Sequence, residues 1–123
     1  MTTIRVMTYN VGGCRGSDGH VDAARVLDVI AGGAPDIVAL QEVDGDPLAH
    51  LAGRLGMRAY GDPACGGNAF LSYHRISGVR AFDLGGGACC LRGDPDGSGR
   101  RVHLFDVRLS PSSRDRHHQV LAL

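Results

Sequence analysis

The strongest constraint on this fold is a pair of apolar segments separated by a stretch with helical periodicity. Residues 4–10 alternate weakly, whereas residues 36–41 carry an unbroken apolar run that suits a strand covered on both faces. Between them, apolar side chains recur at helical spacing over residues 21–30, and a glycine pair ends the pattern. A strand, a helix and a strand over this distance form a crossover, so we expect two parallel strands.

A polar side chain stands at the carboxyl end of each expected strand. Asn10 closes the first strand, and Glu42 directly follows the second. Parallel strands end at one edge of their sheet, and open α/β sheets bind ligands at that edge. An amide oxygen and a carboxylate are donors that a hard divalent cation takes, so we predict a metal site with Asn10 and Glu42 as ligands. The alternatives are an Asn10 that starts a turn and a solvated Glu42.

The rest of the sequence predicts short elements within a single domain over residues 1–123. Ser17 or Asp18 lies near the start of the first helix, where a cap is expected. Two hairpins are expected, one across residues 74–75 and one around the turn at residues 94–99. The further expected elements are helices at 48–55 and 114–123 and strands at 57–60, 68–73, 76–84, 88–91 and 101–109.

Charge and composition exclude some classes of protein. The chain has 13 basic and 13 acidic residues, so a large nucleic-acid footprint is not supported, although nucleic acid stays a possible substrate. No apolar stretch is long enough to cross a membrane, and the first strand follows without an apolar leader, so we expect a cytoplasmic setting. In a cytoplasmic setting we expect the four cysteines to be free, buried thiols. The spacing of the cysteines in the sequence does not suit a structural zinc site. The cysteines are Cys14, Cys65, Cys89 and Cys90.

Several motifs follow one another in a recognisable order. A strand ends in Tyr-Asn, and Pro-Asp-Ile-Val-Ala-Leu-Gln-Glu-Val follows at residues 35–43. Gly-Asn-Ala-Phe-Leu-Ser stands at residues 67–72, a strand ends near Arg-Leu-Ser at 108–110, and Arg-His-His-Gln occupies 116–119. This order resembles the N-terminal half of the endonuclease/exonuclease/phosphatase superfamily, which holds deoxyribonuclease-I-like nucleases, abasic-site endonucleases, inositol-phosphate phosphatases and neutral sphingomyelinases.

The resemblance implies an α/β (α+β) fold in which a mixed β-sheet carries helices on one face, as half of a four-layer αββα sandwich. It also implies Mg²⁺-dependent or Mn²⁺-dependent hydrolysis of a phosphoester. Glu42 would then be a metal ligand with Asn10 beside it, and Asn68 would border the substrate groove. Arg108 replaces a histidine that contacts the scissile phosphate in the family. An arginine binds phosphate but exchanges no proton near neutral pH. A simple ion pair with Asp106 or Asp115 is the alternative for Arg108.

The chain also departs from the family. The family's second half supplies a Gly-Asp-x-Asn segment and a Ser-Asp-His segment with the general base, and neither occurs in these residues. We therefore expect a hydrolase scaffold that is incomplete or inactive as this chain alone. The alternatives are a truncated gene product and a non-catalytic homodimeric module with a weak metal or anion site.

The expected homodimer follows from the resemblance as well. If each half contributes one sheet, this chain forms a single sheet whose apolar inner face is open. Two copies would then meet through that face, because a large apolar face of this kind favours association.

Overall fold

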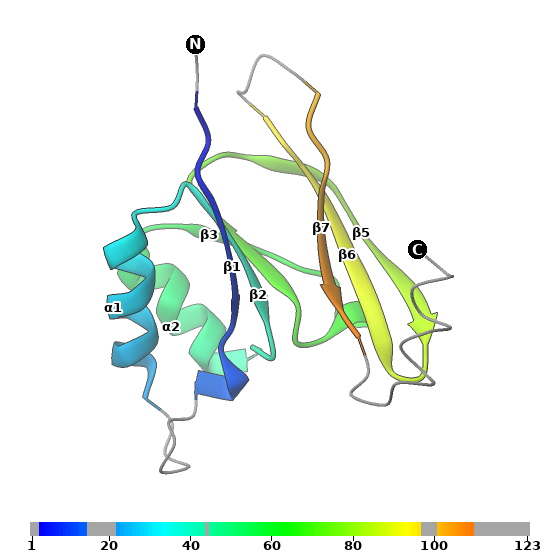
Figure 1. Ribbon diagram of the computed structural model, residues 1–123, viewed down its shortest axis with the longest axis horizontal. Coiled ribbons are helices and arrows are strands. Elements are labelled where there is room, and N and C mark those ends of the chain that lie inside the picture. The colour runs from blue at the N-terminus through cyan, green and yellow to red at the C-terminus, as the bar shows by residue number, and fades with distance from the viewer. Residues whose placement is uncertain (1–2, 15–21, 44, 97–100, 110–123) are drawn as a thin grey trace.

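The strands form two sheets that pack face to face, and two helices cover the outer face of the first sheet (Figure 1). The computed structural model describes residues 3–14, 22–43, 45–96 and 101–109. The first sheet has the order β1 (Val6–Asn10), β2 (Ile37–Gln41), β4 (Ala69–Ser72), β3 (Arg58–Tyr60), and the second has β5 (Ile76–Gly85), β6 (Ala88–Pro95), β7 (Leu104–Arg108). The helices are α1 (Ala23–Gly33) and α2 (Gly45–Leu55), with short 3-10 turns η1 (Gly12–Cys14) and η2 (Pro63–Cys65).

The predicted crossover is confirmed. β1 and β2 pair in parallel, with Asn10 opposite Gln41 at their carboxyl ends. The first four residues of β2 are buried, as a strand covered on both faces requires. α1 begins at Ala23, so its cap is Asp22, which accepts a hydrogen bond from the Arg25 amide at 3.2 Å. A cap at Ser17 or Asp18 is therefore wrong, because the helix starts later than the apolar pattern.

The mixed sheet with helices on one face is also confirmed, but the pairing of its last strand differs from the prediction. β4 pairs antiparallel with both β2 and β3, whereas β5 begins the second sheet. The expected hairpin across residues 74–75 is therefore wrong. The Ser72 hydroxyl explains the change of direction, because it donates to the His74 carbonyl and accepts from the His74 amide. This turn carries the chain from one sheet to the other.

The second predicted hairpin is confirmed, but its first strand runs on to Pro95 and its second strand begins only at Leu104. β6 pairs antiparallel with β7, and Cys89 lies opposite Arg108. β5 also pairs with β6, through a glycine turn at residues 85–87. The expected helix at residues 114–123 lies outside the described residues.

Two of the hydrophobic clusters lie on opposite faces of the first sheet. One lies between the first sheet and the helices and includes Ile30, Leu51 and Leu71. The other lies between the sheets, where Phe70 of β4 and Leu91 of β6 are fully buried. The described residues thus supply the α, β and β layers of the expected sandwich.

The inner face of the first sheet is therefore covered, and the expectation of a single sheet with an open inner face is wrong. The physical reason is that the chain crosses to a second sheet after β4 and folds back over its own inner face. Among the described residues, part of that face on β1 stays open, where Val6 is 50% exposed. An open inner face therefore no longer supports the expected homodimer, which stays a prediction.

Two of the four cysteines form a disulfide. Cys65 at the end of η2 is bonded to Cys89 of β6, so the expectation of free thiols is wrong for this pair. It is confirmed for Cys14 and Cys90, which are free and buried. This pairing cannot be predicted from the spacing of the cysteines, because only the packing of the two sheets brings the two sulfur atoms together. Among the described residues, no helix has the length and apolar character that a membrane span needs.

Candidate functional site

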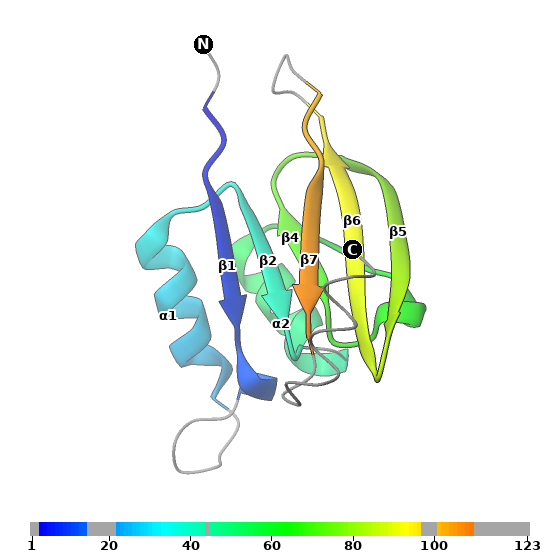
Figure 2. The same ribbon diagram turned by 45° about the vertical axis from the view of Figure 1, so that its right-hand side comes forward.

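The carboxyl ends of β1, β2 and β7 lie at the same end of the molecule (Figure 2). Glu42 follows β2, and Arg108 is the last residue of β7. The Arg108 Nη2 atom lies 3.7 Å from the Glu42 Oε1 atom, so the fold brings these two predicted site residues together. Their side chains are 45% and 40% exposed, which leaves both open to a ligand.

The backbone at Glu42 is in the left-handed region. Its φ is 57°, a conformation that costs a residue with a side chain about 1–2 kcal/mol. Main-chain hydrogen bonds hold it there: the Gly13 amide donates to the Glu42 carbonyl at 2.7 Å, and the Val43 amide donates to the Gly67 carbonyl at 2.9 Å. Strain of this kind persists where the surroundings over-determine the conformation, and it concentrates at functional sites.

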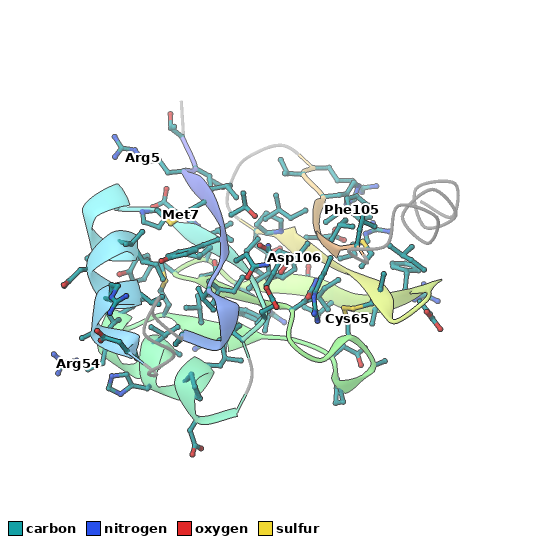
Figure 3. The ribbon with its side chains drawn as sticks, turned by 60° about the horizontal axis from the view of Figure 1, so that its bottom comes forward. Arg5, Met7, Arg54, Cys65, Phe105 and Asp106 are labelled. Carbon is teal, nitrogen blue, oxygen red and sulfur yellow. A yellow bond between two sulfur atoms is a disulfide. The ribbon has the colours of Figure 1, made fainter. Side chains whose placement is uncertain are left out.

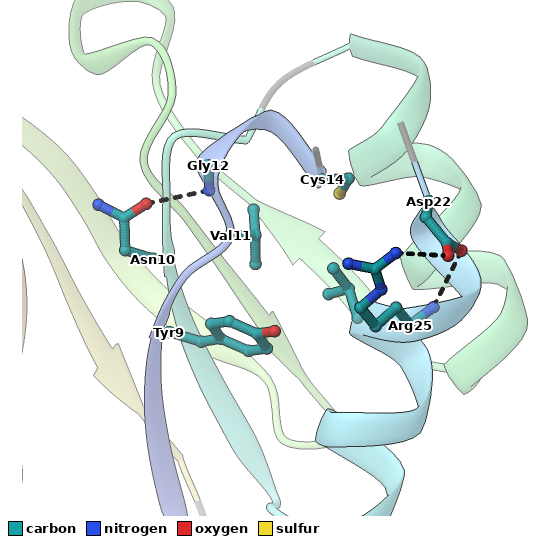
Figure 4. Close-up of a pocket in the computed structure, with 8 residues that line it drawn as sticks. Tyr9, Asn10, Val11, Gly12, Cys14, Asp22 and Arg25 are labelled. Carbon is teal, nitrogen blue, oxygen red and sulfur yellow. Dashed lines mark hydrogen bonds and ion pairs between the residues drawn. The ribbon is translucent and has the colours of Figure 1, made fainter. Parts of the chain in front are cut away.

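Asn10 lies beside Gln41 in the sheet and opens a turn (Figure 4). Its Oδ1 atom accepts a hydrogen bond from the Gly12 amide at 3.0 Å. This is the structural role that the sequence allowed for Asn10, and one lone pair of the oxygen remains for a cation. The residue also lines a pocket of about 250 Å³ that reaches the start of α1, where Arg25 and Asp22 form an ion pair. A ligand role for Asn10 stays a prediction.

Asn68 is buried next to the Glu42–Arg108 ion pair and does not line an open groove. It is 4% exposed, and its Nδ2 atom donates to the Asp106 carbonyl at 2.9 Å. Its Oδ1 atom is buried without a hydrogen-bond partner among the described residues. The residue therefore ties the start of β4 to β7, and a contact between Asn68 and substrate stays a prediction.

Sequence reasoning missed two polar residues between the sheets, Gln41 and Asp106. Asp106 is 1% exposed and lies in the interior (Figure 3). The Gln41 Nε2 atom donates to its Oδ1 atom at 2.7 Å and also lies 3.1 Å from the Thr8 hydroxyl. Burial raises the pKa of Asp106 to about 7, although the bonds from Gln41 and the Ala69 amide oppose the shift. Its Oδ2 atom has no partner among the described residues.

A signal for Asp106 was present in the sequence. Leu104, Asp106 and Arg108 alternate in β7 and so share one face, the face that looks toward the first sheet. A carboxylate on a core-facing side is costly unless it finds a partner. The alternating pattern of β7 therefore identifies Asp106 as a buried carboxylate only when this face of the strand is known to pack against the first sheet.

Two oxygen donors of the kinds that Mg²⁺ takes lie at this edge, and a metal site formed by them stays a prediction. Within the described ranges, no group of three His, Cys, Asp or Glu side chains is placed to hold a metal. Glu42 supplies an accessible carboxylate, and Asn10 supplies an amide oxygen. Mg²⁺ is commonly held by one or two carboxylates and keeps several waters, so this donor set is a minimal one.

Comparison with solved structures finds close likeness over almost the whole chain. An endonuclease/exonuclease/phosphatase from Beutenbergia cavernae is 26% identical, with a TM-score of 0.78, over 97% of this chain and 42% of that one. TDP2 from Caenorhabditis elegans is 22% identical, with a TM-score of 0.73, over 94% of this chain and 38% of that one. A mannosyl-6-phosphatase from Bacteroides thetaiotaomicron is 16% identical, with a TM-score of 0.77, over 98% of this chain and 57% of that one.

The chain thus spans between about two-fifths and three-fifths of the length of these structures. Among curated proteins no match is found. The sequence matches the Endonuclease/Exonuclease/phosphatase family over residues 7–122, which is nearly its full length. The sequence resemblance is confirmed, and the chain belongs to the endonuclease/exonuclease/phosphatase family.

Proposed function

We propose that this chain is the cation-binding and phosphate-binding part of a divalent-metal-dependent phosphoester hydrolase, and that it does not complete hydrolysis alone. The observation that carries the proposal is the 3.7 Å approach of Glu42 and Arg108 at the carboxyl edge of the sheets. A carboxylate that attracts a cation and a guanidinium that attracts a phosphate oxygen stand side by side there. Both kinds of contact stabilise the negative charge of a phosphate group during phosphoester hydrolysis.

Each residue has a defined part in this proposal. Glu42 holds Mg²⁺ or Mn²⁺ through its carboxylate, with the Asn10 oxygen as a second donor. When bound, the cation neutralises charge on the phosphate oxygens. Arg108 presents two N–H donors to the same phosphate, and Asn68 orients the strand start beneath it. Arg108 stays protonated near neutral pH, so it binds and orients but transfers no proton.

We propose that this chain does not activate the attacking water by itself. The two family segments that would hold the general base do not occur in the 123 residues. General-base catalysis contributes typically 10²–10⁴-fold to a rate, so we expect almost no turnover of a phosphodiester by this chain alone. Turnover of bis(4-nitrophenyl) phosphate with Mg²⁺ that Glu42→Gln abolishes would overturn this part of the proposal.

Cation binding can be tested at a single atom. Glu42 is the only glutamate in the chain, so protein labelled with ¹³C at glutamate Cδ gives one carboxylate resonance. Addition of Mg²⁺ should shift that resonance, and Mn²⁺ should broaden it. Asp28→Asn, which removes an exposed carboxylate of α1, is the matched control and should leave the titration unchanged. A resonance that does not respond to millimolar Mg²⁺ would remove the metal role of Glu42.

Two broader expectations remain proposals. The first is the non-catalytic homodimer, which light scattering at micromolar protein tests through the molecular mass. The part of the inner face on β1, where Val6 is half exposed, is the surface that we assign to such a contact. The second is a cytoplasmic setting, in which the Cys65–Cys89 bond would be subject to reduction by cellular thiols.

A further inference from the structure

We propose that the Cys65–Cys89 disulfide is a redox-controlled positioning element for the candidate site. In the oxidised protein it holds the turn at residues 66–68 against Glu42 and Arg108, and in the reduced protein the turn is released. The release concerns the fold alone. Its effect on ligand affinity rests on the proposed function of Glu42 and Arg108.

The bond joins the turn to the strand that neighbours Arg108. Cys65 ends η2 in the first half of the fold, and Cys89 belongs to β6 of the second sheet. In the ladder between β6 and β7, Cys89 is the direct partner of Arg108. The disulfide therefore fixes the turn at the same register position that carries the candidate phosphate ligand.

The turn itself fills the space next to the charged pair. The Gly67 carbonyl accepts from the Val43 amide at 2.9 Å. A Cβ atom added at Gly67 would lie 3.8 Å from the Glu42 Cα atom and 3.9 Å from the Arg108 Nη1 atom. Asn68, the next residue, donates to the Asp106 carbonyl. Movement of this turn therefore changes what lies between Glu42 and Arg108.

The remaining thiols do not compete for this bond. Cys90 follows Cys89 directly, but successive strand residues point to opposite faces, and Cys90 is buried with Leu84 and Ala88 on the outer face of the second sheet. Cys14 is buried in the cluster beneath the helices. Burial raises the pKa of both free thiols, which lowers their thiolate fraction and their reactivity. Oxidation therefore joins Cys65 to Cys89 and leaves Cys14 and Cys90 as free thiols.

The switching step is thiol–disulfide exchange with a dithiol reductant. One thiolate of the reductant attacks the Sγ atom of Cys89, which is half-buried, and breaks its bond to the buried Cys65. The Cys65 sulfur leaves as a thiolate and takes a proton. The second thiol of the reductant then attacks the mixed disulfide, so that Cys89 is released as a thiol and the reductant leaves as its own disulfide. Two electrons and two protons have passed to the protein.

The release is measured by amide hydrogen exchange at Val43, whose N–H bond to Gly67 reports on the turn. The probe is the full chain, oxidised in air or reduced with dithiothreitol at one pH. We expect Val43 to exchange about tenfold faster after reduction, and the Cys65→Ala/Cys89→Ala variant to match the reduced protein without reductant. Cys90→Ala, which removes a neighbouring buried thiol outside the bond, should keep the full redox difference. Equal Val43 rates in oxidised, reduced and doubly substituted protein would overturn the proposal.

The effect on the site is measured with the glutamate Cδ resonance in both redox states. We expect Mg²⁺ to bind about tenfold more weakly in the reduced protein, a loss typical of a removed supporting contact around a metal. Equal affinity in the two states overturns redox control of the site. If Mg²⁺ moves the resonance in neither state, the proposed function of Glu42 fails, and the Val43 exchange rates still decide whether the disulfide holds the turn.

Discussion

Arg108 and Glu42 meet at 3.7 Å although one belongs to the second sheet and the other follows a strand of the first. Because both side chains are partly exposed to solvent, the pair contributes only about 0–1 kcal/mol to stability. Its main consequence is for ligands. The guanidinium shares the carboxylate that a cation would take, so it disfavours the cation and favours a phosphate.

Arg108→Gln should therefore change the two affinities in opposite directions. Loss of one positive charge a few ångströms from the cation should raise Mg²⁺ affinity about fivefold, since a charge pair at this range in water is worth about 1 kcal/mol. Affinity for inorganic phosphate should fall. Both are measured by NMR titration, with Arg80→Gln, an exposed arginine of β5, as control. If the affinities for Mg²⁺ and for phosphate change in the same direction, Arg108 supports the structure of the site and does not act through its charge.

Glu42→Gly should separate stability from function. Glycine adopts the φ of 57° without the penalty that a side chain brings, and part of this gain is offset by its greater freedom when unfolded. We expect the free energy of unfolding in urea to rise by up to about 1 kcal/mol while Mg²⁺ binding is lost. Ala34→Gly, at the left-handed cap of α1, should give a similar gain with Mg²⁺ binding intact. A destabilised Glu42→Gly protein would contradict strain at this position.

Asp106 should make stability fall as pH rises toward neutral. Below about pH 4 its carboxyl is protonated in the folded and unfolded chain alike. Because its folded-state pKa is raised to about 7, between about pH 4 and 7 only the unfolded chain ionises, and each pH unit costs about 1.4 kcal/mol. Above about pH 7 the penalty is complete. Asp106→Asn keeps an acceptor for Gln41 and removes the titration, so urea unfolding at about pH 5 and pH 8 should differ less than in the native protein.

The control for this pH dependence is Asp28→Asn, since Asp28 is exposed on α1. It should retain the loss of about 3 kcal/mol that the native protein shows between those two pH values. A native protein that is equally stable at both would show that Asp106 ionises freely.

Gly93→Ala should test the packing of the second sheet over the first. A Cβ atom at Gly93 would lie 2.6 Å from the Ile76 Cγ2 atom and 3.1 Å from the Phe70 Cε2 atom, in the layer between the sheets. Overpacking of this kind costs typically 1–3 kcal/mol, so the urea midpoint should fall. Gly53→Ala, in α2 with open space around it, should instead stabilise the protein by up to about 1 kcal/mol. A neutral Gly93→Ala would indicate that the two sheets are not in close contact.

Loss of the disulfide should lower global stability as well. The bond closes a loop between cysteines 24 positions apart, and a loop of that length contributes about 3 kcal/mol by restricting the unfolded chain. Cys65→Ala/Cys89→Ala should therefore unfold at a lower urea concentration than the oxidised protein. Reductant should leave the variant's midpoint unchanged and lower that of the native protein. An identical midpoint for the two oxidised proteins would count against a formed bond.

How much of this molecule the sequence predicts depends on the range of the interaction. The unit from β1 to β2 is predictable because its periodicity and its glycine stop are local, and Glu42 is located by the same pattern. The change of sheet after β4 is not, because residues on both sides of the turn at Ser72 have strand character. Nothing in the order of the cysteines selects Cys65 and Cys89, and Asp106 stands out only when its face of β7 is known to be buried.

The buried hydrogen bond between Gln41 and Asp106 joins positions 65 apart in the chain. In kinetic terms the complete site is therefore the product of a long loop closure, because Arg108 joins it only when β7 has docked. The first strand–helix–strand unit carries Asn10 and Glu42, but it has no phosphate ligand of its own. During refolding, ligand binding should therefore appear only when the two sheets have packed together. A ligand that binds only this packed form would also stabilise it against unfolding.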